Sequence, residues 1–404
     1  MEEWKTDRLE NLLEALIDYR GKTPHKTSYG VPLVTAKIIK DGTILPFEEY
    51  IAEEDYDGWM VRGFPQPGDV VMTTEAPLGE VALLDERKVA LAQRVVTLRG
   101  KHGVLNNTYL KYYLQSPVGQ SRLSARETGT TVTGIKQSEL RKVEISYPSI
   151  QTQCKIGAIL KSIDDKIALN NRINHNLEEQ AQTLYKSWFI DFEPFKGGEF
   201  IDSEMGLIPK GWNVVPFLNV AKLCSGGTPK TDVEEYWDGD IPFFTPKDVK
   251  DSAFCLSTEK SITESGLAHC NSQLYNTFTT LITARGTVGK ICMAGIPMAM
   301  NQTNYAIRPH MIIDPIILYH MSRQLVLSLR NKANGAVFDA ITIRDFEGEK
   351  VILADEVVLN KFASLVHSMY ERILQNEKQN IALVSSRDSL LTKLLSGKEG
   401  YLTC

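Results

Sequence analysis

A threonine-rich loop from Gly129 to Gly134 carries the side chains whose types and spacing most clearly suggest chemistry. Hydroxyl and cationic groups gather in and around it: Thr130, Thr131, Thr133, Arg122, Arg126 and Lys136. Hydroxyls, backbone amides and cations in one loop can together hold a phosphate group. An ordinary flexible surface turn is an equally good interpretation of the same residues.

Basic residues are concentrated in two stretches, although the formal net charge of the 404-residue chain is -5. Residues 87–142 contain 11 Lys and Arg against 2 Asp and Glu, and residues 273–344 contain 7 against 2. A solvated basic face is the usual explanation of such an excess. Because the excess recurs in both halves of the chain, it favours two phosphate-facing surfaces.

A long helix must separate the two basic stretches, because apolar residues from Gln151 to Phe192 follow a heptad pattern. The predicted seam is Ile156, Leu160, Ile163, Ile167, Asn170, Asn174, Leu177, Ala181, Leu184 and Trp188. A continuous helix of this length spans about 50 Å, which is longer than most helices of globular proteins. The apolar residues near Trp188 and Phe189 are expected to be exposed, which predicts poor solubility of the chain alone.

The same pattern returns 206 residues later, with two asparagines again in the middle of the seam. Its members are Phe362, Val366, Met369, Ile373, Asn376, Asn380, Leu383, Arg387, Leu390 and Leu394. Two such helices running antiparallel bring asparagine against asparagine, and a buried amide pair is satisfied in one register only. A chance polar gap in each helix is the alternative. We expect one antiparallel coiled coil made by a single chain.

The chain as a whole reads as two copies of one plan, domain then long helix. We place the boundaries at 1–150, 151–196, 197–353 and 354–404, and expect an α+β protein with two similar α/β domains and an internal pseudo-twofold repeat. In the first domain we expect helices over residues 9–19 and 107–123, with strands over residues 69–74, 80–84 and 88–98.

Matching positions in the two domains separate shared residues from candidate base readers. The identical pairs are assigned to structure or phosphate contact: Thr35 with Thr245, Lys37 with Lys247, Gly79 with Gly289, and Gln93 with Gln302. The pairs that differ are reader candidates: Glu75 with Arg285, Glu80 with Lys290, and Arg94 with Thr303. Arginine can bind guanine and a carboxylate can accept from cytosine, while Gln93, Asn301 and Gln302 could bind adenine or stabilise a core. Solvent-facing turn residues are the alternative for each.

Enzyme motifs are weak or missing. An Asn/Asp-Pro-Pro-aromatic loop of an amino methyltransferase does not occur, and Gly286 to Ile291 lacks the spacing and hydroxyl of a phosphate-binding loop. A metal nuclease would have to use Asp69 with Glu86 and Lys88, a single short match. Six scattered cysteines form no zinc pattern. We predict no catalytic residue and no metal site, and a cytoplasmic protein without a signal peptide or membrane span.

The complete chain resembles the DNA-specificity subunit of type I restriction-modification systems. The residues that carry the resemblance are those at 185–192, 206–212, 129–140 and 394–398. The second helix departs from the pattern, because it lacks the Lys-Ser-Trp-Phe ending and has Arg387 where the first has Ala181.

The resemblance implies that each domain reads one half of a split double-stranded DNA site and that the helices set the gap between the halves. It also implies that two adenine-N6 methyltransferase subunits dock on the helices and that restriction subunits join them. S-adenosylmethionine, ATP and Mg would be used by those partners and not by this chain. A coiled-coil scaffold without DNA affinity is the alternative, and steep salt dependence of DNA binding would discriminate against it.

Overall fold

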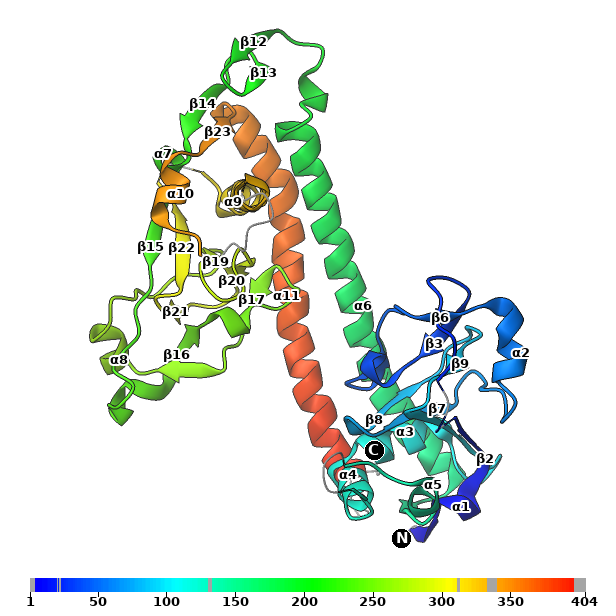
Figure 1. Cartoon of the computed structure of the whole chain (residues 1–404). Coiled ribbons are helices and arrows are strands. Elements are labelled where there is room, and N and C mark those ends of the chain that lie inside the picture. The colour runs from blue at the N-terminus through cyan, green and yellow to red at the C-terminus, as the bar shows by residue number, and fades with distance from the viewer. Residues whose placement is uncertain are drawn as a thin grey trace. The chain divides into compact units, whose positions relative to one another are not determined.

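The computed structural model describes residues 4–19, 21, 23–129, 133–310, 313–332 and 340–395. The chain forms two compact units (Figure 1). Unit 1 comprises Met1–Ile167 together with Ala382–Cys404, and unit 2 comprises Ala168–Ile381. Each unit therefore combines one α+β domain with a segment of each of the two long helices.

Unit 1 is built around an antiparallel sheet with the strand order β2-β10-β7-β8. These strands are β2 (Leu13–Asp18), β10 (Val95–Gly100), β7 (Val70–Thr74) and β8 (Leu78–Leu83). Smaller sheets are formed by β6-β3-β9, β4-β5 and β1-β11. Their strands are β1 (Lys5–Arg8), β3 (Val31–Val34), β4 (Ile39–Lys40), β5 (Thr43–Ile44), β6 (Tyr50–Ile51), β9 (Ala90–Leu91) and β11 (Glu144–Tyr147).

Short helices complete unit 1: α1 (Leu9–Leu12), α2 (Tyr56–Trp59), α3 (Asn107–Gln115), α4 (Pro117–Ser124) and α5 (Gln137–Leu140), with 3-10 turns η1 (Ala36–Ile38) and η2 (Glu53–Asp55). Helix α3 begins where the Asn106 side chain accepts a hydrogen bond from the Tyr109 amide. Its tyrosines are buried in a core that also contains apolar residues of both long helices. The domain and the helix ends of unit 1 thus share one hydrophobic core.

Unit 2 repeats this plan around a five-stranded sheet of order β15-β22-β19-β20-β17. The strands are β15 (Ala221–Ser225), β22 (Asn304–Pro309), β19 (Thr280–Thr283), β20 (Ile291–Ala294) and β17 (Phe254–Cys255). The remaining strands are β12 (Phe200–Ser203), β13 (Gly206–Pro209), β14 (Asn213–Pro216), β16 (Trp237–Phe244), β18 (Lys260–Ile262), β21 (Ala299–Met300) and β23 (Lys350–Leu353). The helices are α7 (Phe217–Val220), α8 (Glu264–Ala268), α9 (Pro315–Lys332) and α10 (Ile343–Glu347), with η3 (Glu193–Phe195), η4 (Glu234–Tyr236) and η5 (Pro246–Asp248).

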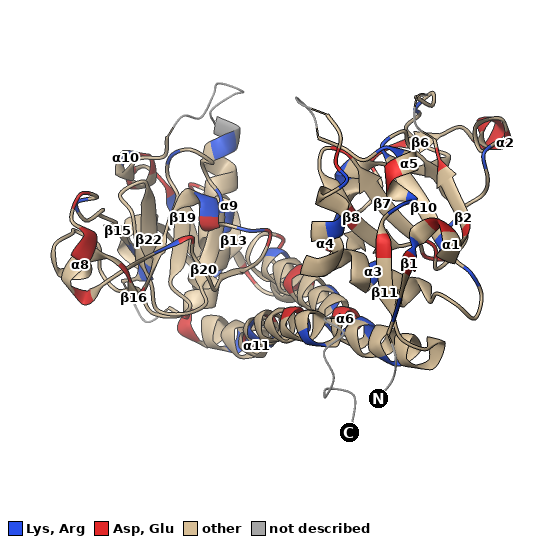
Figure 2. Ribbon diagram, turned by 90° about the horizontal axis from the view of Figure 1, so that it is seen from below, with Lys and Arg blue, Asp and Glu red and all other residues tan. Residues whose placement is uncertain are grey.

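The two long helices are α6 (Ile150–Phe189) and α11 (Glu356–Leu395), each 40 residues long and beginning 206 positions apart. Acidic and basic residues are interspersed along both of them in Figure 2. The single glycine of α6, Gly157, lies where an added Cβ would come within 3.2 Å of Thr108. The missing side chain lets α6 approach the beginning of α3 closely.

The mixed fold with two similar domains and two long helices agrees with the prediction, but three predicted elements of unit 1 are wrong. The helix expected over residues 9–19 ends at Leu12, because the following residues pair with β10 as strand β2. The helix expected over residues 107–123 is interrupted at Ser116, whose hydroxyl caps a new helix starting with Pro117. The strand expected over residues 88–98 is two strands, β9 and β10. Within the part of the chain described here, no helix is long and apolar enough to cross a membrane.

Candidate nucleic-acid interface and helix pairing

Three segments that contain predicted DNA-binding residues converge at the end of β7 in unit 1. The amide of Thr74, the last residue of β7, donates to the carbonyl of Arg94 at 3.0 Å. The carbonyl of Thr74 accepts from the amide of Ile135 at 2.9 Å, and Glu75 forms a β-bridge with Gly134. Residues far apart in the sequence are therefore held side by side by backbone hydrogen bonds.

Unit 2 repeats this backbone arrangement at the end of β19. The amide of Ala284 donates to the carbonyl of Thr303 at 2.9 Å, and the amide of Ile341 donates to the carbonyl of Ala284 at 2.9 Å. Arg285 forms a β-bridge with Ala340. The pairs Glu75 with Arg285 and Arg94 with Thr303, matched by sequence, thus occupy equivalent places in the two units. We call each of these convergent edges a reading edge.

The side chains on the two reading edges differ in charge and in the partners that they contact. In unit 1, Arg94 Nε lies 2.8 Å from Glu75 Oε1, so the two reader candidates form an ion pair with each other, about half exposed. In unit 2, Thr303 donates its hydroxyl to Asn301 Oδ1 at 2.7 Å. Arg285 is exposed and makes no ion pair with any residue that the structure describes. The two edges therefore present different chemical groups on one backbone plan.

The residues shared by both units make equivalent structural contacts. Thr23 donates to Gln93 Oε1 at 3.3 Å, and Thr228 donates to Gln302 Oε1 in the same way. These contacts join each glutamine to the Gly-x-Thr-Pro segment of its own unit.

The remaining predicted DNA-binding residues are cations and the threonine-rich loop. Lys37 and Lys247 are exposed on the equivalent turns η1 and η5, and Lys247 lies 3.8 Å from Glu259. Thr287 donates its hydroxyl to the carbonyl of Pro246 at 3.5 Å, which holds η5 against the turn that carries Arg285. Lys136 is exposed just before α5. Thr130 and Thr131 lie outside the described residues.

Lys290 faces a different environment from Arg285. It lines a polar pocket of about 400 Å³ together with His175 of α6, Lys250 and Arg323. Its amide donates to the Thr283 hydroxyl at 3.0 Å, and the Gly289 amide donates to the Thr283 carbonyl at 2.9 Å. Because these two amides are engaged, they are not available to bind a phosphate group.

Asp69, the candidate for a nuclease metal site, has a structural role. It is 1% exposed, and its carboxylate accepts two hydrogen bonds from Arg99 at 2.7 and 2.8 Å. Among the described residues no cluster of His, Cys, Asp and Glu could hold a metal ion.

The four predicted asparagines lie together between α6 and α11 in unit 2. Asn170 Nδ2 donates to Asn380 Oδ1 and to Gln379 Oε1, both at 2.8 Å, and Asn376 Nδ2 donates to Asn174 Oδ1 at 2.8 Å. Asn170 and Asn376 are 0% and 2% exposed. The side-chain oxygen of Asn170, Oδ1, has no hydrogen-bond partner among the described atoms. Only one antiparallel register allows these hydrogen bonds between the asparagines of the two helices.

The predicted apolar pairing residues lie on both sides of the asparagines. Ile163 and Leu383 are half-buried in unit 1, and Leu177 and Met369 pack against the core of unit 2. Near the end of α6, Trp188 and Phe189 contact Phe362 of α11, with ring centroids 5.7 and 4.9 Å apart.

The expected exposure of Trp188 and Phe189 is wrong. Phe189 is 5% exposed, and its ring lies 5.8 Å from that of Trp212. Trp188 is half-buried and packs edge-on against Phe195, at 6.0 Å. The entry segment of the second domain covers this end of α6, so these residues add to the core of unit 2.

An ionic cluster that joins α3, α6 and α11 in unit 1 was not predicted from the sequence. Asp164 Oδ2 accepts from Lys111 Nζ at 2.7 Å and from the Tyr112 hydroxyl at 2.6 Å, and Asp164 Oδ1 accepts from Arg387 at 3.1 Å. Burial by itself raises the pKa of Asp164, but these donors hold that pKa below its ordinary value. Arg387, which departs from the seam pattern, was the one available signal.

The equivalent place in unit 2 is aromatic. Aligning α11 with α6 makes Tyr370 the residue that corresponds to Asp164. Aligning α9 with α3 at their N-terminal caps, Asp314 and Asn106, makes His320 the residue that corresponds to Tyr112. The Tyr370 hydroxyl is 3.1 Å from His320 Nε2, and the His320 ring stacks on Tyr185 at 5.0 Å. Burial lowers the pKa of His320 to about 3.

Two α+β domains with matching reading edges and a shared antiparallel helix pair define a class of modular DNA-recognition protein. The family model described as type I restriction modification DNA specificity domain matches residues 1–179 and 209–380. The chain therefore belongs to this family.

Individual relatives agree with this assignment. The chain is 29% identical over 411 residues to the type I restriction enzyme MjaIX specificity subunit of Methanocaldococcus jannaschii, covering 98% of this chain and 93% of the relative. It is 23% identical to the HindI specificity subunit of Haemophilus influenzae, over 69% of this chain and 73% of the relative. A crystal structure of the S subunit of a type I system from M. genitalium has the same fold, with a TM-score of 0.63, 17% identity, and coverage of 98% of this chain and 97% of that one.

Proposed function

We propose that this chain is the non-catalytic DNA-specificity subunit of a type I restriction-modification complex. Residues 1–150 and 197–353 each read one half of a split DNA target, and the helices at 151–196 and 354–404 set the gap between the halves. The observation that supports this proposal is the pair of reading edges. The two edges have the same backbone pairing, but one presents Glu75 and Arg94 and the other presents Arg285 and Thr303. Different side chains on the same backbone are what two domains that read different DNA sequences require.

The proposed partners follow from the family. Two adenine-N6 methyltransferase subunits dock on the helix pair and modify both halves of the site, and restriction subunits join this complex. S-adenosylmethionine, ATP and Mg serve those partners, and the assembly works in the cytoplasm. The exposed Lys37, Lys136 and Lys247 supply sequence-independent phosphate contacts.

The experiment that tests the function is a methylation map. The chain is co-expressed with its cognate methyltransferase in a host without adenine methylation, and modified adenines are located across the genome. The expected result is one motif of two short specified halves around a fixed gap. A soluble complex that methylates a continuous motif, or none, would refute the proposal and leave the coiled-coil scaffold as the explanation.

A further inference from the structure

The pseudo-twofold repeat allows the two units to be compared position by position. Helices α6 and α11 match with an offset of 206, as do strands β11 and β23. Helices α3 and α9 match with an offset of 208 through their N-terminal caps. Tyr113 of unit 1 therefore corresponds to Met321 of unit 2, Glu144 to Lys350, and Ser146 to Ile352.

In unit 1 the space between these three positions is filled by one side chain. The Arg122 guanidinium donates to the Tyr113 hydroxyl, to the Glu144 carbonyl at 2.8 Å and to Ser146 Oγ at 3.1 Å. Arg122 reaches this position from α4, the short helix that starts at Pro117 after α3 has ended. A hydrogen-bonded arginine thus occupies this place in unit 1.

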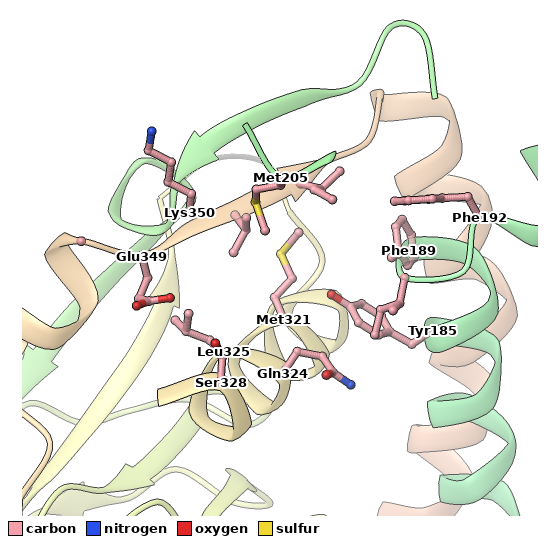
Figure 3. Close-up of a pocket in the computed structure, with 14 residues that line it drawn as sticks. Tyr185, Phe189, Phe192, Met205, Met321, Gln324, Leu325, Ser328, Glu349 and Lys350 are labelled. Atoms are coloured by element: carbon pink, nitrogen blue, oxygen red, sulfur yellow. The ribbon is translucent and has the colours of Figure 1, made fainter. Parts of the chain in front are cut away.

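In unit 2 the corresponding positions line an open pocket of about 580 Å³. Met321, Lys350 and Ile352 are all part of its wall, which is completed by aromatic residues from the end of α6, including Tyr185 and Phe189. Figure 3 shows Met205, from the turn between β12 and β13, and Met321, from α9, pointing toward each other across the pocket. Thioether side chains adapt their shape to an inserted apolar group.

The lysines at this pocket are already paired within the chain, and the wall also carries the carboxylate of Glu349. Lys350 Nζ lies 2.5 Å from Glu204, and Lys186, one residue after Tyr185, pairs with Asp191. Paired lysines beside a carboxylate offer little attraction to nucleic acid or to another anion, and the apolar part of the wall complements an uncharged apolar surface.

Apolar side chains also continue beyond the pocket. Ile190 and Met205 on its wall are 42% and 48% exposed, and Leu207, two residues further on, is 60% exposed. An apolar surface that extends past the pocket suits a macromolecule better than a small ligand.

We propose that this pocket, which we call the methionine pocket, receives a bulky apolar side chain from a protein partner. The inference rests on the proposed function, which makes a methyltransferase subunit that partner. Because Arg122 fills the corresponding place in unit 1, only one of the two methyltransferase copies inserts such an anchor. The two copies therefore bind this chain with unequal affinity.

The test titrates the full-length chain with its purified cognate methyltransferase, without DNA, and follows stoichiometry by native mass spectrometry and affinity by calorimetry. Met205→Glu places a charge at the mouth of the pocket, and Ser328→Phe fills the pocket from α9. Leu274→Glu is the matched control, because Leu274 is apolar and 45% exposed in unit 2 but belongs neither to the pocket wall nor to the helix pair. Melting curves verify that each variant is folded.

The wild type and Leu274→Glu are expected to bind two copies, whereas both pocket variants lose about tenfold or more in affinity for one copy only. Unchanged affinity in both pocket variants, or equal loss for both copies, would overturn the inference while leaving the proposed function intact. Failure of the wild type to bind any methyltransferase would overturn both. The methylation map of the wild-type complex separates these cases.

Discussion

Lys111 Nζ lies 2.7 Å from Asp164 Oδ2, and the Lys111 side chain is only 4% exposed. This ion pair links α3 of the first domain to α6, and Arg387 extends it to α11 at 3.1 Å. Charged side chains therefore join α3, α6 and α11 in unit 1, and each of these helices has a counterpart in unit 2. The aromatic contacts of His320, Tyr370 and Tyr185 perform the same task in unit 2.

Asp164→Asn is expected to destabilise unit 1 strongly. The substitution leaves the buried Lys111 ammonium without its counter-charge, a change that costs about 3–5 kcal/mol. Chemical denaturation monitored separately for the two units would measure it. The control is Asp165→Asn, because Asp165 is 61% exposed and its pair with Lys161 is worth less than about 1 kcal/mol. Equal effects of the two substitutions would contradict the assigned role of Asp164.

The buried imidazole of His320 predicts acid sensitivity of unit 2. The unfolded chain binds a proton at this residue near its ordinary pKa of about 6.5, whereas in the folded chain burial lowers the pKa to about 3. Stability from this group is thus complete above pH 6.5 and is lost as pH falls from 6.5 toward 3. The loss is about 1.4 kcal/mol per pH unit, or about 2 kcal/mol at pH 5.

His320→Gln removes the titration and should flatten the stability of unit 2 between pH 7 and pH 5. His175→Gln serves as the control, because the His175 side chain is 73% exposed. Denaturation midpoints of the wild type and of both variants, measured at pH 7 and pH 5, would show whether His320 causes the acid sensitivity. A parallel loss of stability in the wild type and in His320→Gln would show that another group is responsible.

The internal repeat explains why much of this structure could be predicted from the sequence. Asn170 and Asn376 recur at equal heptad steps, so the antiparallel register followed from the sequence alone. The matched pair Glu75 and Arg285 located equivalent turns because backbone geometry recurs even when the side chains differ. Repetition supplied the long-range information that a single pattern lacks.

Contacts between residues far apart in the sequence could not be predicted where they do not recur in both units. The residues around Leu13 satisfy a helical pattern, but pairing with β10 makes them a strand. Nothing near Glu75 in the sequence shows that Arg94 will neutralise it. Lys111 and Asp164 are 53 positions apart, and only the packing of α3 on α6 brings them together.

Leucine in place of both Asn170 and Asn376 is expected to strengthen helix pairing and weaken its register. The side-chain oxygen of Asn170 is buried without a partner, so replacing these amides should stabilise unit 2 by about 1–3 kcal/mol. Without the asparagines the helices can pair in more than one register, so the gap in the methylated motif should vary in length. Gln375→Leu, at an exposed position of α11, is the control. Unaltered melting together with an unaltered gap would count against the central asparagines.

Arg285→Ala and Lys247→Ala are expected to change DNA binding in different ways: the first changes sequence selectivity, and the second changes affinity for every sequence. Arg285 is exposed on a reading edge, so its loss should cost about 1–3 kcal/mol and relax selectivity at one base position of one half-site. Loss of Lys247, a proposed phosphate contact, should weaken all sequences equally and reduce the salt slope by about 1. Binding of the complex to half-site variants at several salt concentrations separates the two. Equal loss on every sequence after Arg285→Ala would remove it from the readers.

Lengthening the helix pair is expected to lengthen the gap and leave both half-sites unchanged. Asn170 contacts Asn380 and Asn174 contacts Asn376, so residues added after Asn171 must be matched by residues added after Lys378. Seven residues in each helix keep the heptad and add about 10 Å, which corresponds to about three base pairs.

The methylation map measures the gap directly, and insertion into α6 alone is the control. The single insertion places Asn174 out of register with Asn376 and should lower stability, whereas the paired insertion restores the contact. A changed half-site sequence after the paired insertion, or an unchanged gap in a stable complex, would show that the helices do not measure the distance between the readers.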